Sequence, residues 1–187
     1  MYSRDYRHQA WDSLRGRWGI AILACVIVSA ITSVASFIPC GSMLALGILA
    51  VGMASFMTSL IRNQEPNLSQ LFDGFQTNLV NNLIAGVLET LFIALWSLLL
   101  IVPGIVKGYS YAMTFYILKD HPEMTGTEAI TESRRMMDGN KWRLFCLDMS
   151  FIGWYLLSIV TFGILLFWVM PYHEAAHAAF YEDVKNS

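Results

Sequence analysis

The clearest chemical pattern in the chain is a pair of histidines, His173 and His177, with Glu174 between them. Histidines four positions apart lie on one face of a helix, so both imidazoles could reach a single zinc ion. The intervening glutamate could then deprotonate a zinc-bound water molecule. Such an ion needs a third protein ligand, for which Asp148 is the first candidate and Glu89 the second.

Other features favour a non-catalytic explanation of the same residues. Only ten residues follow His177, which leaves little chain to shape a substrate cleft. The sequence around Asp148 also lacks the glycine expected in the second motif of an intramembrane metalloprotease. We therefore expect no catalytic residue, no resident metal and no cofactor, and we keep an intramembrane zinc hydrolase as an alternative.

The same side chains define a predicted polar layer, which consists of Glu89, Asp148, His173, Glu174 and His177. Ionisable residues inside apolar helices are costly, so each is a functional candidate. A rise of 1.5 Å per residue from the predicted outer turns places them at depths of roughly 15 to 21 Å. The layer is therefore the best candidate for a functional site in the chain. Alternatively, Glu89 and Asp148 are structural and form hydrogen bonds with Asn81, Asn82 or the backbone, and the chain from Glu174 onward lies in water.

The elements that must position these residues are membrane helices. No charged residue occurs over the 44 positions from Trp18 to Ile61, and the whole chain is 56 % hydrophobic with only 14 % charged residues. A single helix of that length would be about 66 Å long, twice the hydrocarbon thickness of a bilayer. The Pro39-Cys40-Gly41 sequence interrupts the run as a turn would. The sequence thus predicts an all-α, multi-pass membrane protein.

Three Gly-containing breaks, at 37–41, 101–105 and 160–164, divide the apolar sequence into hairpins. The predicted spanning helices are 18–37, 41–61, 79–102, 105–119, 142–160 and 164–182. The single membrane domain, 1–187, then comprises an interfacial helix (1–17), a first hairpin (18–61), a polar loop (62–78), a second hairpin (79–119), a loop with a short helix (120–141), and a third hairpin with its tail (142–187).

Basic residues indicate the orientation of these helices. Every lysine and arginine except Lys107 lies in the N-terminal segment, near the polar loops or in the tail. The positive-inside rule therefore places both termini and both polar loops in the cytoplasm. The Gly-containing turns, with Cys40 in the first, are expected to face outward.

Two amphipathic helices are expected outside the spans. In the first, Tyr6, Ala10, Leu14 and Trp18 form an apolar stripe that would lie on the membrane surface. The second begins at Thr125 with a capping box and carries an apolar stripe that includes Met136 and Met137. It is expected to lie under the bundle or along the inner leaflet, with a docking surface for a partner as the alternative. The candidate residues for docking a partner or the membrane are Arg4, Arg7, Arg15, Arg17, Met136 and Met137.

A set of residues in the second half of the chain resembles the motifs of a known family. They are residues 98–107, Tyr109, Tyr111, Met113, Glu128, Ala129, Ile130, Ser133, Met136, Met137, Gly139, Lys141, residues 150–154, Thr161, Gly163, Pro171, Tyr172, Phe180 and Tyr181. The chain is similar to the bacterial integral-membrane family catalogued as domain of unknown function nine-seven-five. The resemblance covers nearly the whole chain and is most specific from about residue 95. It implies a multi-helix protein of the bacterial cell membrane, and no reaction.

We therefore predict a non-enzymatic integral membrane protein that acts as a scaffold, a sensor or a membrane-protective module. One alternative is a subunit that binds or transports a small molecule or lipid through the polar layer. Under either function, the expected partners of the protein are the lipid bilayer and either another membrane protein or a second copy of the chain. A formal net charge of -2 argues against a nucleic-acid partner.

Overall fold

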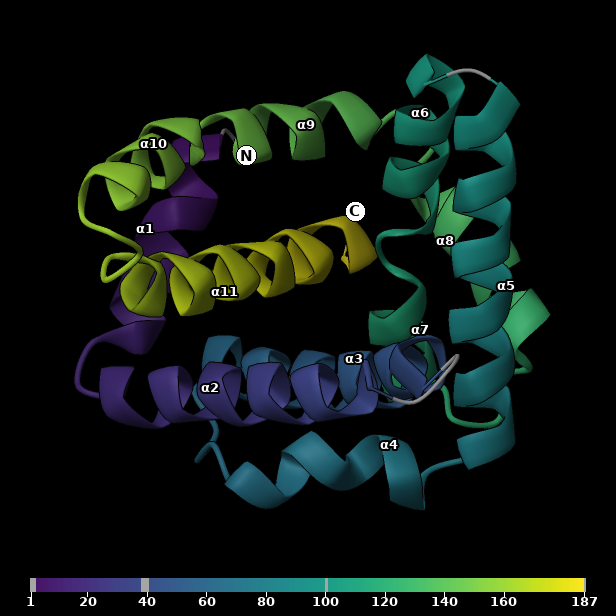
Figure 1. Ribbon diagram of the computed structural model, residues 1–187, viewed down its shortest axis with the longest axis horizontal. Helices are drawn as coiled ribbons and strands as arrows, with labels where there is room; N and C mark the ends of the chain where they lie inside the picture. Colours follow the sequence, from purple (N-terminus) through teal and green to yellow (C-terminus); the bar gives the residue numbers. More distant parts are fainter. Residues whose placement is uncertain (1–2, 38–40, 100, 187) are drawn as a thin grey trace.

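The computed structural model describes residues 3–37, 41–99 and 101–186, and this part of the chain is helical without any strand (Figure 1). The helices are α1 (Ser3–Leu14), α2 (Trp18–Ala35), α3 (Gly41–Ile61), η1 (Leu68–Phe72), α4 (Asp73–Gln76), α5 (Leu79–Leu99), α6 (Ile101–Tyr111), α7 (Thr114–Asp120), α8 (Gly126–Met136), α9 (Lys141–Met149), α10 (Ile152–Val160) and α11 (Leu166–Lys185). The all-α class predicted from the sequence is confirmed.

Of the three predicted turns, the described residues confirm the one at 160–164, whereas residues 101–105 of the second lie within α6. The α10–α11 turn contains Phe162 and Gly163, which both have positive φ values, of 52° and 83°. At the α5–α6 break, Pro103 lies in the first turn of α6, where the missing N–H has no helical partner to lose. The tip of the first hairpin, with Cys40, lies outside the described residues.

Two predicted spans are interrupted. The 105–119 span is divided between α6 and α7, and the 142–160 span between α9 and α10. Within the described residues, three stretches are long and apolar enough to cross a membrane: Trp18–Ala35, Leu79–Ser97 and Lys141–Val160. Gly47–Ile61 is a shorter apolar helix. These helices are compatible with a membrane protein, but six full spans are not shown.

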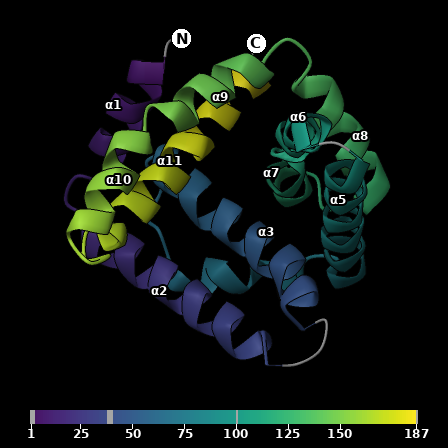
Figure 2. The ribbon, with the colours of Figure 1, turned by 45° about the horizontal axis from the view of Figure 1, so that its top comes forward.

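The three hairpins do not share one axis. In Figure 1, α2, α3 and α11 run across the view, whereas α5 runs along its vertical edge. Figure 2 shows α3 between α11 on one side and α5 to α7 on the other. Helix α3 packs against α2, α5, α7 and α11, and it buries Phe56, Met57 and Leu60 completely. It is therefore the central helix of the fold.

The predicted polar loop 62–78 is partly helical and packs on α3. Asn67 and Gln70 form a capping box that starts η1, and Ser55 of α3 donates a hydrogen bond to Asp73 at 2.6 Å. The close packing requires glycine at Gly52, because a Cβ atom there would lie 2.0 Å from the Leu71 carbonyl oxygen. This segment is thus part of the folded core.

Helix α1 forms as predicted, but its apolar stripe does not face lipid. Tyr6, Ala10 and Leu14 are buried, and α1 packs against α11. The opposite face exposes Trp11, whose ring makes edge contacts with Trp18 and Tyr172. The prediction that the stripe lies on the membrane is wrong, because an apolar stripe indicates a buried face without specifying whether protein or lipid covers it.

Helix α8 has the predicted capping box. The Thr125 amide and hydroxyl both donate to the Glu128 carboxylate at 2.8 Å. The apolar stripe packs against α5 and α7, Met137 is fully buried, and Met136 packs against the core. Met137 is therefore not available to a partner in this fold, whereas Met136 stays partly exposed and its role in docking remains a prediction.

Candidate functional site

Helices α9 and α11 bring three of the predicted polar residues together. The Nε2 atom of His177 lies 2.7 Å from Asp148 Oδ1, and the Nε2 atom of His173 lies 3.0 Å from the same oxygen. One ligand atom from each residue can be chosen so that all three lie within 4.8 Å of one another. Each side chain is about one-fifth exposed. We call this group the Asp–His cluster.

Aromatic side chains fix the geometry of the Asp–His cluster. The Tyr109 hydroxyl of α6 donates to Asp148 Oδ2 at 2.9 Å and leaves Oδ1 to the histidines. The His173 ring makes edge contacts with Phe151 and Tyr155, with centroid separations of 4.8 and 5.8 Å. These contacts restrict rotation of the His173 imidazole and of the Asp148 carboxylate.

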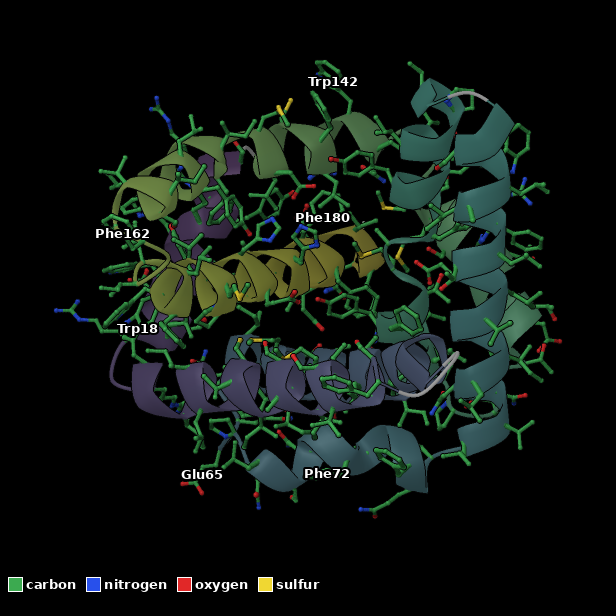
Figure 3. All side chains as sticks on the ribbon, in the orientation of Figure 1. Trp18, Glu65, Phe72, Trp142, Phe162 and Phe180 are labelled. Atoms are coloured by element: carbon green, nitrogen blue, oxygen red, sulfur yellow. The ribbon has the colours of Figure 1, made fainter. Side chains whose placement is uncertain are left out.

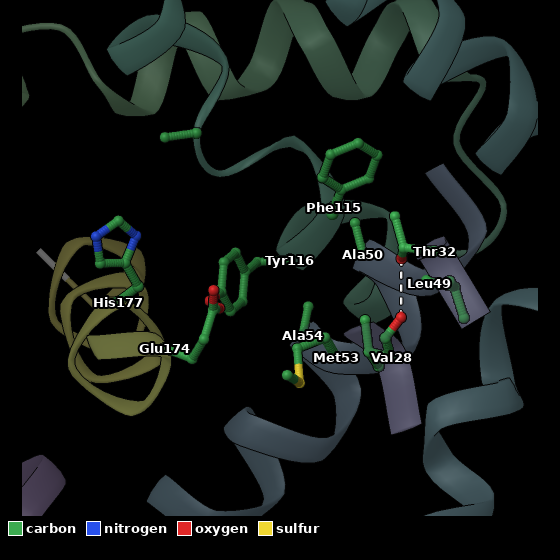
Figure 4. A pocket seen from close by; sticks show the side chains of 11 residues that line it. Val28, Thr32, Leu49, Ala50, Met53, Ala54, Phe115, Tyr116, Glu174 and His177 are labelled. Atoms are coloured by element: carbon green, nitrogen blue, oxygen red, sulfur yellow. Dashed lines mark hydrogen bonds between the residues drawn. The ribbon is translucent and has the colours of Figure 1, made fainter. Parts of the chain in front are cut away.

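Glu174 projects into a separate space. Together with His177 it lines a cavity of about 300 Å³ between α11 and the α2, α3 and α7 helices. Figure 4 shows Glu174 turned toward the Tyr116 ring, with Met53 and Ala54 on the facing wall. The rest of the lining is mostly apolar. The cavity thus combines an apolar body with one carboxylate and the edge of one imidazole.

Glu89 does not join the other predicted residues. Its Oε2 atom is buried on α5 and has no hydrogen-bond partner in the described part of the chain. The suggestion that nearby asparagines satisfy it is also wrong, because the Asn81 amide donates to Met124 and the Asn82 amide to Gly74 and Thr77. The predicted layer therefore separates into the Asp–His cluster, Glu174 in its cavity, and an isolated Glu89.

The non-parallel hairpins explain this separation. Counting depth from the turns assumes that all three hairpins are parallel and that their turns lie in one plane. The second hairpin runs in a different direction from α11, so Glu89 at a similar counted depth lies elsewhere. The same geometry brings Tyr109 close to Asp148, although Tyr109 lies much nearer to the turn of the second hairpin than Asp148 does to the turn of the third. Sequence counting missed Tyr109 for this reason, since only the family resemblance had drawn attention to it.

An ionic network that was not predicted gathers at the end of α11. Asp120 at the end of α7 accepts hydrogen bonds from Arg62 at 2.9 Å and Tyr181 at 2.9 Å, and it also pairs with Lys119 and Lys185. Burial by itself would raise the pKa of Asp120, but hydrogen bonds from Arg62, Lys185 and Lys119 hold the pKa well below its ordinary value of 3.8. The network therefore depends on an ionised Asp120.

A second network joins α1 and α9 to α11. Arg143 donates to Asp183 at 2.5 Å and to the Tyr6 hydroxyl, and Tyr6 donates to Asp183 at 2.7 Å. The two networks together connect the first, second and third hairpins and α1 around the last turns of α11.

The predicted docking arginines have different roles in the structure. Arg7 donates to the Ser150 carbonyl oxygen at 3.2 Å, and Arg17 donates to the Gln64 carbonyl oxygen at 3.1 Å. Arg4 and Arg15 are exposed. Of these four arginines, only Arg4 and Arg15 are therefore wholly available to a membrane surface or a partner.

The second half of the chain matches a known protein family. The family model described as "Protein of unknown function (DUF975)" matches residues 98–187. No curated protein matches the chain, and no solved structure does either. The matched part contains Tyr109 and every residue of the Asp–His cluster, and it leaves residues 1–97 outside the match. The resemblance of this chain to the family of unknown function nine-seven-five is thus confirmed over residues 98–187.

Proposed function

We propose that the protein is a non-enzymatic, multi-pass membrane protein that acts as a scaffold, a sensor or a protective module of the bilayer. One observation carries this proposal: in the three candidate spans, only 17 %, 17 % and 22 % of the residues are buried within the protein. Apolar surface on that scale requires another apolar partner, and lipid is the partner that we propose. Figure 3 shows Phe162 projecting from the tip of the third hairpin, where it is 98 % exposed.

The ionic networks support one orientation in a bacterial cell membrane. Arg62, Asp120, Arg143 and Lys185 meet around the end of α11, and charged groups of this kind belong in water rather than in hydrocarbon. We place this end, both termini and α8 in the cytoplasm, as the positive-inside rule requires. Another membrane protein or a second copy of the chain would then bind to the apolar faces of the hairpins.

The position of Glu174 supports a non-enzymatic role. A zinc hydrolase of the predicted type needs this carboxylate beside the water that the metal activates. Glu174 instead lies in the cavity toward Tyr116, and it is outside the cluster formed by Asp148 and the two histidines.

The cavity favours one second candidate function, the binding of a small molecule or lipid. A volume of about 300 Å³ lies at the lower end of ligand-pocket sizes. Its mostly apolar lining with the single Glu174 carboxylate suits a ligand that has an apolar body and a cationic head.

The Glu174→Gln variant tests both ideas in liposomes that contain the purified full-length protein. We expect wild type and variant to cleave a casein substrate and a membrane-embedded peptide no faster than empty liposomes. Hydrolysis by wild type that disappears in the variant would contradict the non-enzymatic proposal. For the second candidate, dodecyltrimethylammonium should raise the melting temperature of wild type but not of the variant, whereas equal melting temperatures would remove it.

A further inference from the structure

The Asp–His cluster has the ligand types of a metal site, which suggests a role beyond that of a hydrogen-bonded ion pair. Imidazole nitrogens and a carboxylate oxygen are the ligands that zinc and its neighbouring divalent ions accept. Asp148 and the two histidines come from two helices, α9 and α11, and they converge on one point. We propose that Asp148, His173 and His177 bind one divalent transition-metal ion, with zinc the expected occupant, and that this ion ties α9 to α11.

The distances fit this proposal with little movement. Three ligand atoms placed tetrahedrally at zinc–ligand distances of 2.0 to 2.2 Å are separated by roughly 3.3 to 3.6 Å. The two histidine nitrogens now lie 2.7 and 3.0 Å from Asp148 Oδ1. Lengthening these two separations by roughly 0.3 to 0.9 Å would reach the tetrahedral values, and the three ligand atoms already lie within 4.8 Å of one another.

Neighbouring groups already orient the ligands. A metal-binding carboxylate is normally held by a hydrogen bond to its second oxygen, and the Tyr109 hydroxyl provides one to Asp148 Oδ2 at 2.9 Å. The edge contacts of Phe151 and Tyr155 hold the His173 ring in place. The site therefore has its ligands and an outer shell from α6, α9, α10 and α11.

The ion would also add a link between two helices that already meet. Arg143 of α9 pairs with Asp183 of α11, and Leu144 and Leu147 of α9 are fully buried. A metal bridge between Asp148 and the two histidines would join α9 to α11 at a second point. This inference does not depend on the proposed function, because either a scaffold or a ligand-binding protein could carry such an ion.

The test uses the full-length protein without a histidine tag, purified in detergent, loaded with zinc and desalted. Elemental analysis should find about one zinc per chain in wild type and less than one-tenth as much in His177→Ala. The matched control is His121→Ala, which removes an exposed histidine at the end of α7 and should retain the zinc. Tyr109→Phe leaves all three ligands and should weaken zinc affinity by about 10- to 100-fold.

A second readout covers the case in which His177→Ala does not fold. Zinc should raise the melting temperature of wild type by roughly 5 °C or more at saturating concentration, and the rise should be smaller for Tyr109→Phe at equal zinc. Wild type that retains no zinc and shows no shift would overturn the proposal and leave the cluster as a hydrogen-bonded ion pair. Zinc binding that is equal in wild type and a folded His177→Ala would overturn it as well.

Discussion

Gly52→Ala is expected to lower the free energy of unfolding by about 3 kcal/mol, at the upper end of the usual cost of overpacking. The added methyl group would lie 2.0 Å from the Leu71 carbonyl oxygen and 2.5 Å from its carbonyl carbon. Both atoms belong to backbone, so η1 would have to move away from α3. Thermal unfolding of the detergent-purified variant should show a clear loss of stability.

Gly153→Ala is the matched control for this substitution. Gly153 lies within α10, and apart from its chain neighbours and the backbone of its own helix no atom lies within 4 Å of the position that a Cβ would occupy. Alanine there should leave stability unchanged or raise it by up to about 1 kcal/mol, because alanine is the better helix former. Equal effects of the two substitutions would mean that η1 does not pack closely on α3.

Asp120→Ala is expected to cost about 2 to 4 kcal/mol of unfolding free energy. The Asp120 side chain is only 8 % exposed and binds Arg62, Lys119, Lys185 and Tyr181. Removing Asp120 deprives Lys119 and Lys185 of this carboxylate, whereas Arg62 keeps its ion pair with Glu182 at 2.7 Å. We place the cost below the largest known values because Arg62 and Lys185 keep partial contact with water.

Asp120 is also expected to make the stability of the protein depend on pH in the acid range. The pKa of Asp120 is lower in the folded protein than its ordinary value of 3.8, so the folded state favours the ionised form. Its contribution is complete above about pH 5 and is lost as the pH falls through the folded pKa. Unfolding measured between about pH 7 and pH 3 should therefore show a steeper acid loss in wild type than in Asp120→Ala.

Arg135→Ala provides the control for both measurements. Arg135 pairs with Glu132 on the surface of α8 and its side chain is 79 % exposed. Exposed pairs contribute little, so this substitution should change the melting temperature and its pH dependence far less than Asp120→Ala does. If Asp120→Ala behaved in the same way, the network around α11 would have no role in holding the hairpins together.

Features that depend on local sequence could be predicted well. The capping box at Thr125, the glycine turn at Gly163 and the helical face of α8 each arise from residues within a few positions of one another. The pairing of His173 with His177 is equally local, since it needs only a helix. Asp148 was identified as their neighbour because the third hairpin brings α9 and α10 back alongside α11.

Features that depend on tertiary packing could not be predicted in the same way. The stripe of Tyr6, Ala10 and Leu14 indicated a buried face, but the sequence does not say that α11 covers it. The direction of the second hairpin relative to the third decides that Tyr109 meets Asp148 and that Glu89 does not. The Asn67 and Gln70 capping box was a local signal in the predicted loop 62–78, and recognising it would have identified η1.

The most direct test of a multi-pass membrane protein is thiol labelling from each side of the membrane. In a background with Cys40 and Cys146 replaced by alanine, Ile164→Cys places a thiol in the exposed α10–α11 turn, and Arg134→Cys places one on the exposed face of α8. In intact cells, a membrane-impermeant maleimide should label only Ile164→Cys, and in inside-out vesicles it should label only Arg134→Cys. Labelling of both positions from the same side would contradict the proposed multi-pass topology.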